Sequence, residues 1–258
     1  MLPQSLLVLV SALAITSAGL VRKRCESANA SSTVLATASS SPTPLASATL
    51  PQTGGATELP TVNGTLKAIV VGHGIQNYTC TAAGANATSA GALAVLYDIT
   101  GLYSSMTDEQ RTQLPVSVLR DTELPLNLAG DADDQYAANV SNPWKADADI
   151  TVGGINTPLK VLGHHYFDAA STPTFDLYNA ASLFFKGGKL YGAKAPASAD
   201  PGLLNTGAVD WLLLGNKGAS VGLADVYRVV TAGGNALACD KAGQTFSVPY
   251  AAQYWYYA

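Results

Sequence analysis

Alternating apolar and polar positions run through the chain from about residue 58 to its end, and they predict strands. Val, Leu, Tyr and Thr are common in this part, whereas Glu and Lys are scarce, a balance that favours strands over helices. The predicted strands are 66–71, 75–81, 92–98, 159–167, 174–177, 182–186, 189–193, 211–215, 224–231 and 245–257, the last with a break near Pro249.

Glycines mark two of the predicted strand connections. Gly72-His73-Gly74 is expected to join or bend the first two strands, and Gly187-Gly188, between Lys186 and Lys189, predicts a two-residue hairpin.

One helix is predicted after residue 107. Thr107 can cap it, Asp108 and Glu109 suit its positive end, and Pro115 is expected to limit its length. The stretch 114–144 has the least regular pattern and is expected to be a long insertion. These patterns predict a mainly β fold for residues 58–258: a single antiparallel β-sandwich or barrel-like domain with one or two short helices, large enough for a substantial core.

The N-terminal residues form a short apolar run that ends at Thr16-Ser17-Ala18. Small residues after such a run are typical of a cleaved secretory signal, so residues 1–18 are predicted to be a signal peptide. The run is too short to span a bilayer comfortably. Arg22-Lys23-Arg24 follows and resembles a processing site of the secretory pathway; an exposed charge cluster is the alternative.

Residues 19–57 are rich in Pro, Ser, Thr and Ala. Such a segment cannot bury a core, so a disordered, O-glycosylated linker with a possible propeptide is predicted. Five N-glycosylation sequons also favour a eukaryotic, extracellular glycoprotein. Their asparagines are Asn29, Asn63, Asn77, Asn86 and Asn139. Asn77 lies in a strand-like stretch, where modification is expected to be blocked.

The chain has three cysteines. In an oxidising compartment Cys80 and Cys239 are the natural disulfide partners, because both lie in the folded part. Cys25 lies in the predicted linker, where it can pair between chains, bind a thiol or stay free.

The charge and the motifs exclude several classes of function. The net charge of −4, with few Lys and Arg, argues against nucleic acid and anionic membrane surfaces as partners. The C-terminus lacks the spacer and hydrophobic tail of a lipid-anchor signal, so no membrane anchor is expected. No cofactor is expected either. Gly72-His73-Gly74 begins like the glycine-rich motif that binds dinucleotides, but Asn77 stands where the third glycine of that motif would be. Gly218-Ala219-Ser220-Val221-Gly222 matches the nucleophile elbow of α/β-hydrolases. Those enzymes need a histidine after the serine, and every histidine here precedes Ser220, so this match does not indicate a catalytic triad.

A histidine-rich stretch offers the strongest candidate chemistry. His165 is predicted to meet Asp176 or Asp168 across a hairpin and form a His–carboxylate pair, which can ligate a metal or act as a general base. His164 and His165 point to opposite sides of a regular strand, so only one of them can join such a site. The alternative is a purely structural hydrogen-bonded pair.

The aromatic C-terminal strand is a second candidate site. Tyr254, Trp255 and Tyr256, with Tyr250 and Tyr257, can form a platform for a sugar or a partner protein. Strand alternation places about half of these rings in the core instead.

Several of these stretches together resemble the domain-of-unknown-function 3455 family of secreted fungal and bacterial proteins. The similar pieces run in order over nearly the whole domain from about Glu58. They are Gly74 to Cys80, Ala92 to Asp98, His165-Tyr166, Pro173 to Asp176, Asp210 to Leu214, Tyr227 to Gly234, Cys239 and Val248 to Tyr257. The resemblance implies a secreted, mostly β domain with a Cys80–Cys239 disulfide. It implies no reaction, and the malate dehydrogenase label of fungal members has no fingerprint here to support it.

Two hypotheses of function follow. The first is a secreted, fungal, non-catalytic binding protein that acts at the cell wall or the host interface. Its partner would be a wall polysaccharide or an extracellular host protein, such as a protease that it inhibits. The alternative is a secreted hydrolytic or metal-assisted enzyme that uses His165 and Asp176.

Overall fold

The computed structural model describes residues 48–177 and 183–258, in which strands dominate and one α-helix forms. The strands are β1 (Leu66–Thr79), β2 (Thr88–Asp98), β3 (Lys160–Phe167), β4 (Pro173–Leu177), β5 (Leu183–Ala193), β6 (Trp211–Asn216), β7 (Asp225–Gly233) and β8 (Thr245–Tyr257). A 3-10 turn, Tyr103–Ser105, precedes the helix α1 (Asp108–Asp121). The predicted signal peptide and processing site lie outside the described residues.

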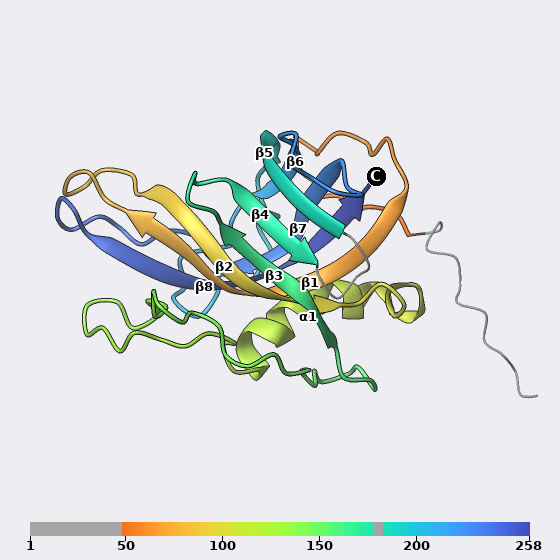
Figure 1. The fold of residues 1–258 in the computed structure, drawn as a ribbon, viewed down its shortest axis with the longest axis horizontal. Helices are drawn as coiled ribbons and strands as arrows, with labels where there is room; N and C mark the ends of the chain where they lie inside the picture. The colour runs from red at the N-terminus through yellow and green to blue at the C-terminus, as the bar shows by residue number, and fades with distance from the viewer. Residues whose placement is uncertain (1–47, 178–182) are drawn as a thin grey trace, which may run out of the picture. The chain divides into compact units, whose positions relative to one another are not determined.

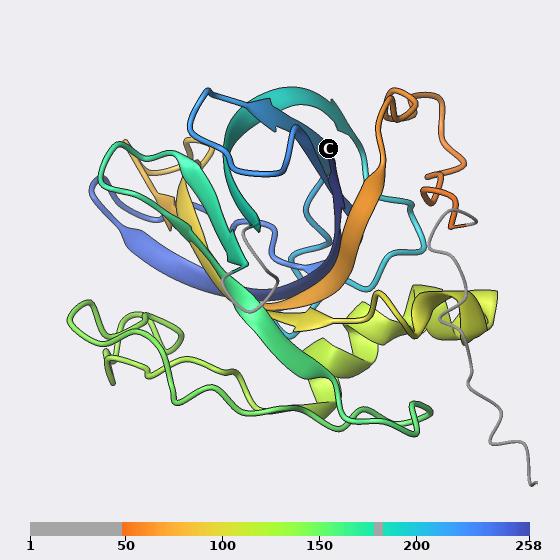
Figure 2. The same cartoon turned by 45° about the vertical axis from the view of Figure 1, so that its right-hand side comes forward.

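The strands form one closed antiparallel barrel in which each strand pairs with its neighbours in the sequence. β8 closes the barrel by pairing with β1 along nearly its whole length. The helix α1 and the long 122–159 connection lie outside the barrel (Figures 1 and 2). Closure leaves no unpaired sheet edge, and it decides between the two predicted architectures in favour of the barrel.

Both faces of the barrel wall are buried where β1 and β8 pair. The inward residues of β8 include Tyr250, Tyr254 and Tyr256, which belong to the core inside the barrel. Trp255 and Tyr257 point outward and pack beneath the covering segments, together with residues of α1. This double burial explains why β8 is apolar along its length and does not show simple alternation.

The helix runs through Pro115 and continues to Asp121, so the prediction that Pro115 limits it is wrong. Thr107 caps it as predicted, in a capping box with Gln110. Proline at this position removes the N–H that would bond the Arg111 carbonyl. The side chain of Gln253 on β8 donates a 2.6 Å hydrogen bond to that carbonyl instead.

The predicted hairpin at Gly187-Gly188 is wrong, because β5 continues through it. The two strands predicted on either side of Gly72-His73-Gly74 are one continuous strand, β1. Close approach explains these glycines better than turns do, because a Cβ on Gly74 would lie 1.8 Å from the Leu93 carbonyl oxygen. β8 likewise passes Pro249 unbroken, since Pro249 lies one residue beyond the last pair with β7.

The end of the predicted linker packs on the barrel. Ala48 and Leu50 contact the outer core, and Thr53 and Glu58 hydrogen-bond to each other. Residues 48–57, which the prediction assigned to the linker, therefore include positions in contact with the barrel domain.

The predicted disulfide between Cys80 and Cys239 is confirmed. It joins the end of β1 to the loop after β7 and packs among Tyr78, Phe246 and Val248. The bridge thus anchors the loop that carries Gly234, whose carbonyl accepts a 2.7 Å hydrogen bond from the Tyr78 hydroxyl.

Candidate functional site

His165 and Asp176 do not form the predicted pair. His165 lies opposite Phe175 in the β3–β4 ladder, and Asp176 lies opposite His164. Residues directly opposite each other in an antiparallel pair share one face, and neighbours along a strand alternate. His165 therefore points into the barrel, whereas Asp176 points outward. The predicted pairing of these two residues is wrong.

The His165 ring is held in a neutral form inside the barrel. Its Nδ1 lies 2.8 Å from the Thr174 carbonyl oxygen, and its ring stacks on Phe175 at 3.9 Å. Burial lowers the pKa of His165 to about 3. Because a carbonyl only accepts, Nδ1 carries the proton and Nε2 is left as an acceptor.

The other residues of that candidate site lie on the outer face. Asp168 forms a 2.8 Å ion pair with Lys186, and this contact lowers the pKa of Asp168 to about 2. His164 stacks on Trp144 and approaches Asp147 at 3.1 Å. Within residues 48–177 and 183–258 no three His, Cys, Asp or Glu side chains converge as metal ligands.

The C-terminal aromatics do not form an exposed platform. Tyr254, Trp255 and Tyr256 are all buried, so the prediction of a surface binding platform is wrong. Trp255 packs edge-on against Tyr103 outside the barrel wall. Tyr254, by contrast, faces a cavity inside the barrel.

This cavity, the barrel pocket, has a volume of about 420 Å³. Its polar lining comes from Gln76, Tyr78, Ser89, His165, Lys189, Lys194, Asp210, Arg228, Asn235 and Tyr254. Its apolar lining includes Ala92, Phe175 and Leu214. Eight-stranded barrels have an interior that is either filled by side chains or holds one small ligand. Polar groups set among apolar walls are typical of ligand pockets of this size.

Arg228 is the most prominent charged group of the barrel pocket. It extends inward from β7, opposite Tyr254 on β8 and Leu212 on β6. Its Nε and Nη2 atoms donate hydrogen bonds of 3.2 and 2.9 Å to the carbonyl oxygen of Asp210. Arg228 was not among the predicted site residues, because a charged residue between the apolar neighbours Tyr227 and Val229 ordinarily indicates a side chain that faces solvent.

Three buried polar side chains lie near Arg228: those of Gln76, Tyr250 and Tyr254. The hydroxyls of Tyr250 and Tyr254 lie 2.8 Å apart. The amide Nε2 of Gln76 lies close to the Tyr250 hydroxyl without a hydrogen bond of proper geometry to any described residue. Burial raises the pKa of both tyrosines, and the positive charge of Arg228 opposes this rise. Both phenols are therefore neutral at physiological pH.

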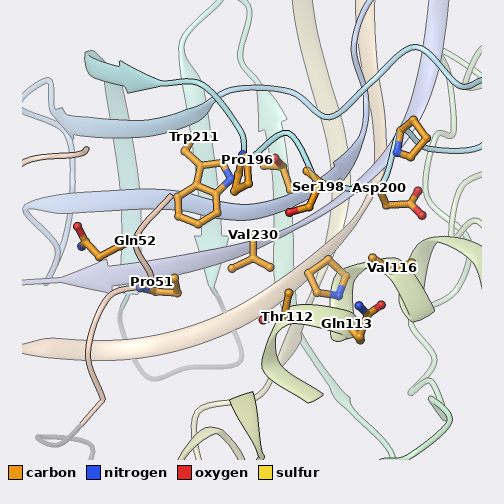
Figure 3. A pocket seen from close by; sticks show the side chains of 14 residues that line it. Pro51, Gln52, Thr112, Gln113, Val116, Pro196, Ser198, Asp200, Trp211 and Val230 are labelled. Carbon is orange, nitrogen blue, oxygen red and sulfur yellow. The ribbon is translucent and has the colours of Figure 1, made fainter. Parts of the chain in front are cut away.

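A second cavity, the outer cleft, lies between α1 and the barrel wall (Figure 3). Its volume is about 340 Å³, and Pro51, Pro196, Trp211 and Val230 are among its lining residues. Val230 has a left-handed backbone (φ 46°) at the irregular end of β7, which is strained for a β-branched residue.

The outer cleft has no net charge to attract a ligand. Its one carboxylate, Asp200, is bound by Arg120 at 2.7 Å. The buried Trp211 Nε1 has no hydrogen-bond partner among the described residues, but it does not reach the surface of the cleft. We therefore place the candidate site in the barrel pocket, which combines volume, charge and polar groups.

The predicted glycosylation sites differ in exposure. Asn63, Asn86 and Asn139 are exposed. Asn77 is half-buried, and its Oδ1 lies 3.0 Å from the Ser247 hydroxyl. Asn29 lies outside the described residues.

Comparisons with known proteins bear on the family. A family model described as "Protein of unknown function (DUF3455)" matches residues 60–258. No curated protein and no solved structure matches the chain significantly. Among the described residues, no helix is both long and apolar enough to cross a bilayer. Because the family model covers most of the chain, this protein belongs to the DUF3455 family, as its resemblance predicted.

Proposed function

We propose that this protein is a non-catalytic binding protein whose barrel pocket holds one small organic molecule. The observation that carries the proposal is the pocket of about 420 Å³ with Arg228, Gln76 and His165 set among apolar walls. Pockets of this kind bury most of a small ligand and orient it with a few polar groups.

We also propose that the protein acts outside the cell, as a glycoprotein at a fungal wall or host interface. The apolar N-terminal run, the exposed sequons and the Cys80–Cys239 bridge support this location. Burial of the C-terminal aromatics removes the platform that a polysaccharide chain would need. A small molecule therefore fits the structure better than a polymer does.

The enzyme alternative is not favoured. It depended on His165 and Asp176, which point to opposite faces of the barrel wall. A base with a pKa of about 3 is also far from the value that suits proton transfer near neutral pH.

Native mass spectrometry and thermal unfolding of the secreted protein test the proposal. We expect a co-purified or added small molecule to bind with one-to-one stoichiometry and to raise the melting temperature. Leu212→Trp fills the mouth of the barrel pocket and should abolish both effects. The matched variant Val116→Trp fills the outer cleft and should preserve them.

Two results would overturn the proposal. If Val116→Trp abolished binding while Leu212→Trp preserved it, the site would be the outer cleft. If no ligand co-purified and no compound in a broad metabolite library stabilised the protein, the barrel pocket would be only a packing defect.

A further inference from the structure

The charge lining the barrel pocket is opposite in sign to that of the whole protein. The chain carries a net charge of −4. The pocket is nevertheless lined by three cations, Lys189, Lys194 and Arg228, and by one carboxylate, Asp210. A hollow site with low-dielectric walls focuses such a field and raises the local concentration of ions of opposite charge.

Arg228 has N–H groups beyond those that face the Asp210 carbonyl and the Tyr254 hydroxyl. A guanidinium has five N–H groups, and here two of its nitrogens bond the single carbonyl oxygen of Asp210. No carboxylate lies within 4.0 Å of Arg228 in the part of the chain that the structure describes. Residues 178–182, which are not described, contain no Asp or Glu.

The carboxylate that lines the pocket with Arg228 is turned to another cation. Asp210 contributes its carbonyl oxygen to Arg228, whereas its carboxylate oxygen lies 3.1 Å from Lys194 Nζ. Arg228 is half-buried, and removing a charge from water is costly unless the charge is paired. The arrangement therefore leaves room for an anion that none of the described residues supplies.

The same wall offers an apolar surface beside Arg228. The stacked rings of His165 and Phe175 and the side chain of Leu214 form apolar wall. A bare inorganic anion would leave this apolar surface uncovered.

From this geometry, and resting on the proposed function, we infer that the ligand of the barrel pocket is a small organic carboxylate. Its carboxylate would lie against the guanidinium of Arg228. Its ring or short alkyl body would pack on the His165–Phe175 stack. Arginine suits this role because its planar fork matches the two oxygens of a carboxylate.

Isothermal titration of the full-length secreted protein with acid–amide pairs tests the inference. The probes are cinnamate, indole-3-acetate and octanoate, each compared with its neutral carboxamide, and inorganic phosphate. We expect at least one acid to bind about tenfold or more tightly than its amide, as charge-assisted hydrogen bonds imply. Affinity for that acid should fall with added salt and affinity for its amide should not. Phosphate should bind more weakly than the acid.

Variants assign the preference to Arg228. Arg228→Gln should reduce the acid-to-amide ratio to about one, whereas Arg228→Lys should keep part of it. Lys67→Gln removes one exposed positive charge outside the pocket and should leave the ratio unchanged. The salt dependence is measured on the unaltered protein, so the test stands even if Arg228→Gln does not fold.

The outcomes separate this inference from the proposed function. Equal binding of an acid and its amide overturns the carboxylate inference and leaves a ligand-binding barrel. A preference for the acid that survives in Arg228→Gln overturns the role of Arg228. Tighter binding of phosphate than of every acid assigns the site to phosphate. If no acid binds while a neutral compound of the metabolite library does, the carboxylate inference fails and the proposed function stands; if nothing co-purifies and no compound of that library binds, the proposed function fails as well.

Discussion

The Gln253 side chain on β8 donates a 2.6 Å hydrogen bond to the carbonyl of Arg111, the helical carbonyl that Pro115 leaves without its usual partner. Gln253 is fully buried, and its Oε1 accepts a 3.2 Å hydrogen bond from Trp255 Nε1. The Gln253 amide thus bonds both the Arg111 carbonyl of the helix and the buried N–H of Trp255. These bonds hold α1 against the outside of the barrel.

Gln253→Met should therefore destabilise the protein strongly. It leaves the Arg111 carbonyl and the Trp255 N–H buried without partners, at a cost of about 2–4 kcal/mol for the two groups. Pro115→Ala restores a backbone N–H to the Arg111 carbonyl, so the cost of Gln253→Met should be about 1 kcal/mol smaller in that background. Urea unfolding of the unaltered protein, the two single variants and the double variant measures this double-mutant cycle. Equal costs in both backgrounds would show that the Arg111 bond contributes nothing.

The tyrosine pair inside the barrel should behave as a coupled unit. Tyr250→Phe or Tyr254→Phe leaves the other hydroxyl without its 2.8 Å partner, and each should cost about 1–3 kcal/mol of unfolding free energy. The double variant should cost less than the sum, because it removes both hydroxyls together. Strict additivity in denaturant unfolding would argue that the two hydroxyls do not interact.

The disulfide should contribute substantially to stability. It closes a loop with a sequence separation of 159, for which chain entropy gives about 5 kcal/mol as an upper value. Replacing Cys80 and Cys239 by Ser should lower the unfolding free energy by about 2–5 kcal/mol. Cys25→Ser is the matched control and should leave it unchanged. A reductant should lower the stability of the unaltered protein but not that of the double variant, and any other pattern contradicts the assignment.

Stability should fall in mild acid because two histidines are buried in the neutral form. The pKa values of His73 and His165 are lowered by burial to about 3, and Lys145 adds to the effect at His73. The unfolded chain, with histidine pKa values near 6.5, binds protons first, so stability is full above about pH 6.5 and is lost as the pH falls toward 3. Each histidine should account for a loss of about 1 kcal/mol between pH 7 and 5.5.

Urea unfolding at several pH values checks this slope. His73→Gln and His165→Gln should each flatten it by a similar amount, whatever their effect on stability at pH 7. If both variants kept the slope of the unaltered protein, another group would be responsible.

Glycan occupancy should follow exposure. We expect glycans at the exposed Asn63, Asn86 and Asn139, and an unmodified Asn77, whose amide is half-buried beside Ser247. Glycopeptide mass spectrometry of the secreted protein measures each site. Full occupancy of Asn77 would mean that this end of β1 opens before or after folding.

Local patterns predicted the elements of this fold well and their ends poorly. The apolar runs located every strand, and Thr107 with Asp108 marked the start of α1. Glycine and proline were misleading because each has two physical uses. Gly74 was interpreted as part of a join or bend between two strands, yet it lies within one strand and permits close approach of β2. Pro115 was interpreted as a helix end, yet a side chain from β8 replaces its missing hydrogen bond.

The candidate site was less predictable because it depends on strand register. A shift of one residue exchanges the two faces of a strand. The β3–β4 register separates His165 from Asp176, and the β7–β8 register places Arg228 beside Tyr254. No local pattern carried that information.

The sequence by itself determined the family, the β-rich composition, the helix cap and the disulfide partners. Each of these depends on residue types, short-range spacing or a resemblance to known sequences. Only the tertiary structure decided that the sheet closes into a barrel, that the aromatic strand is buried on both faces, and that Arg228 enters the interior. These features arise from pairing between residues far apart in the chain, where the geometry of closure selects which side chains face the pocket.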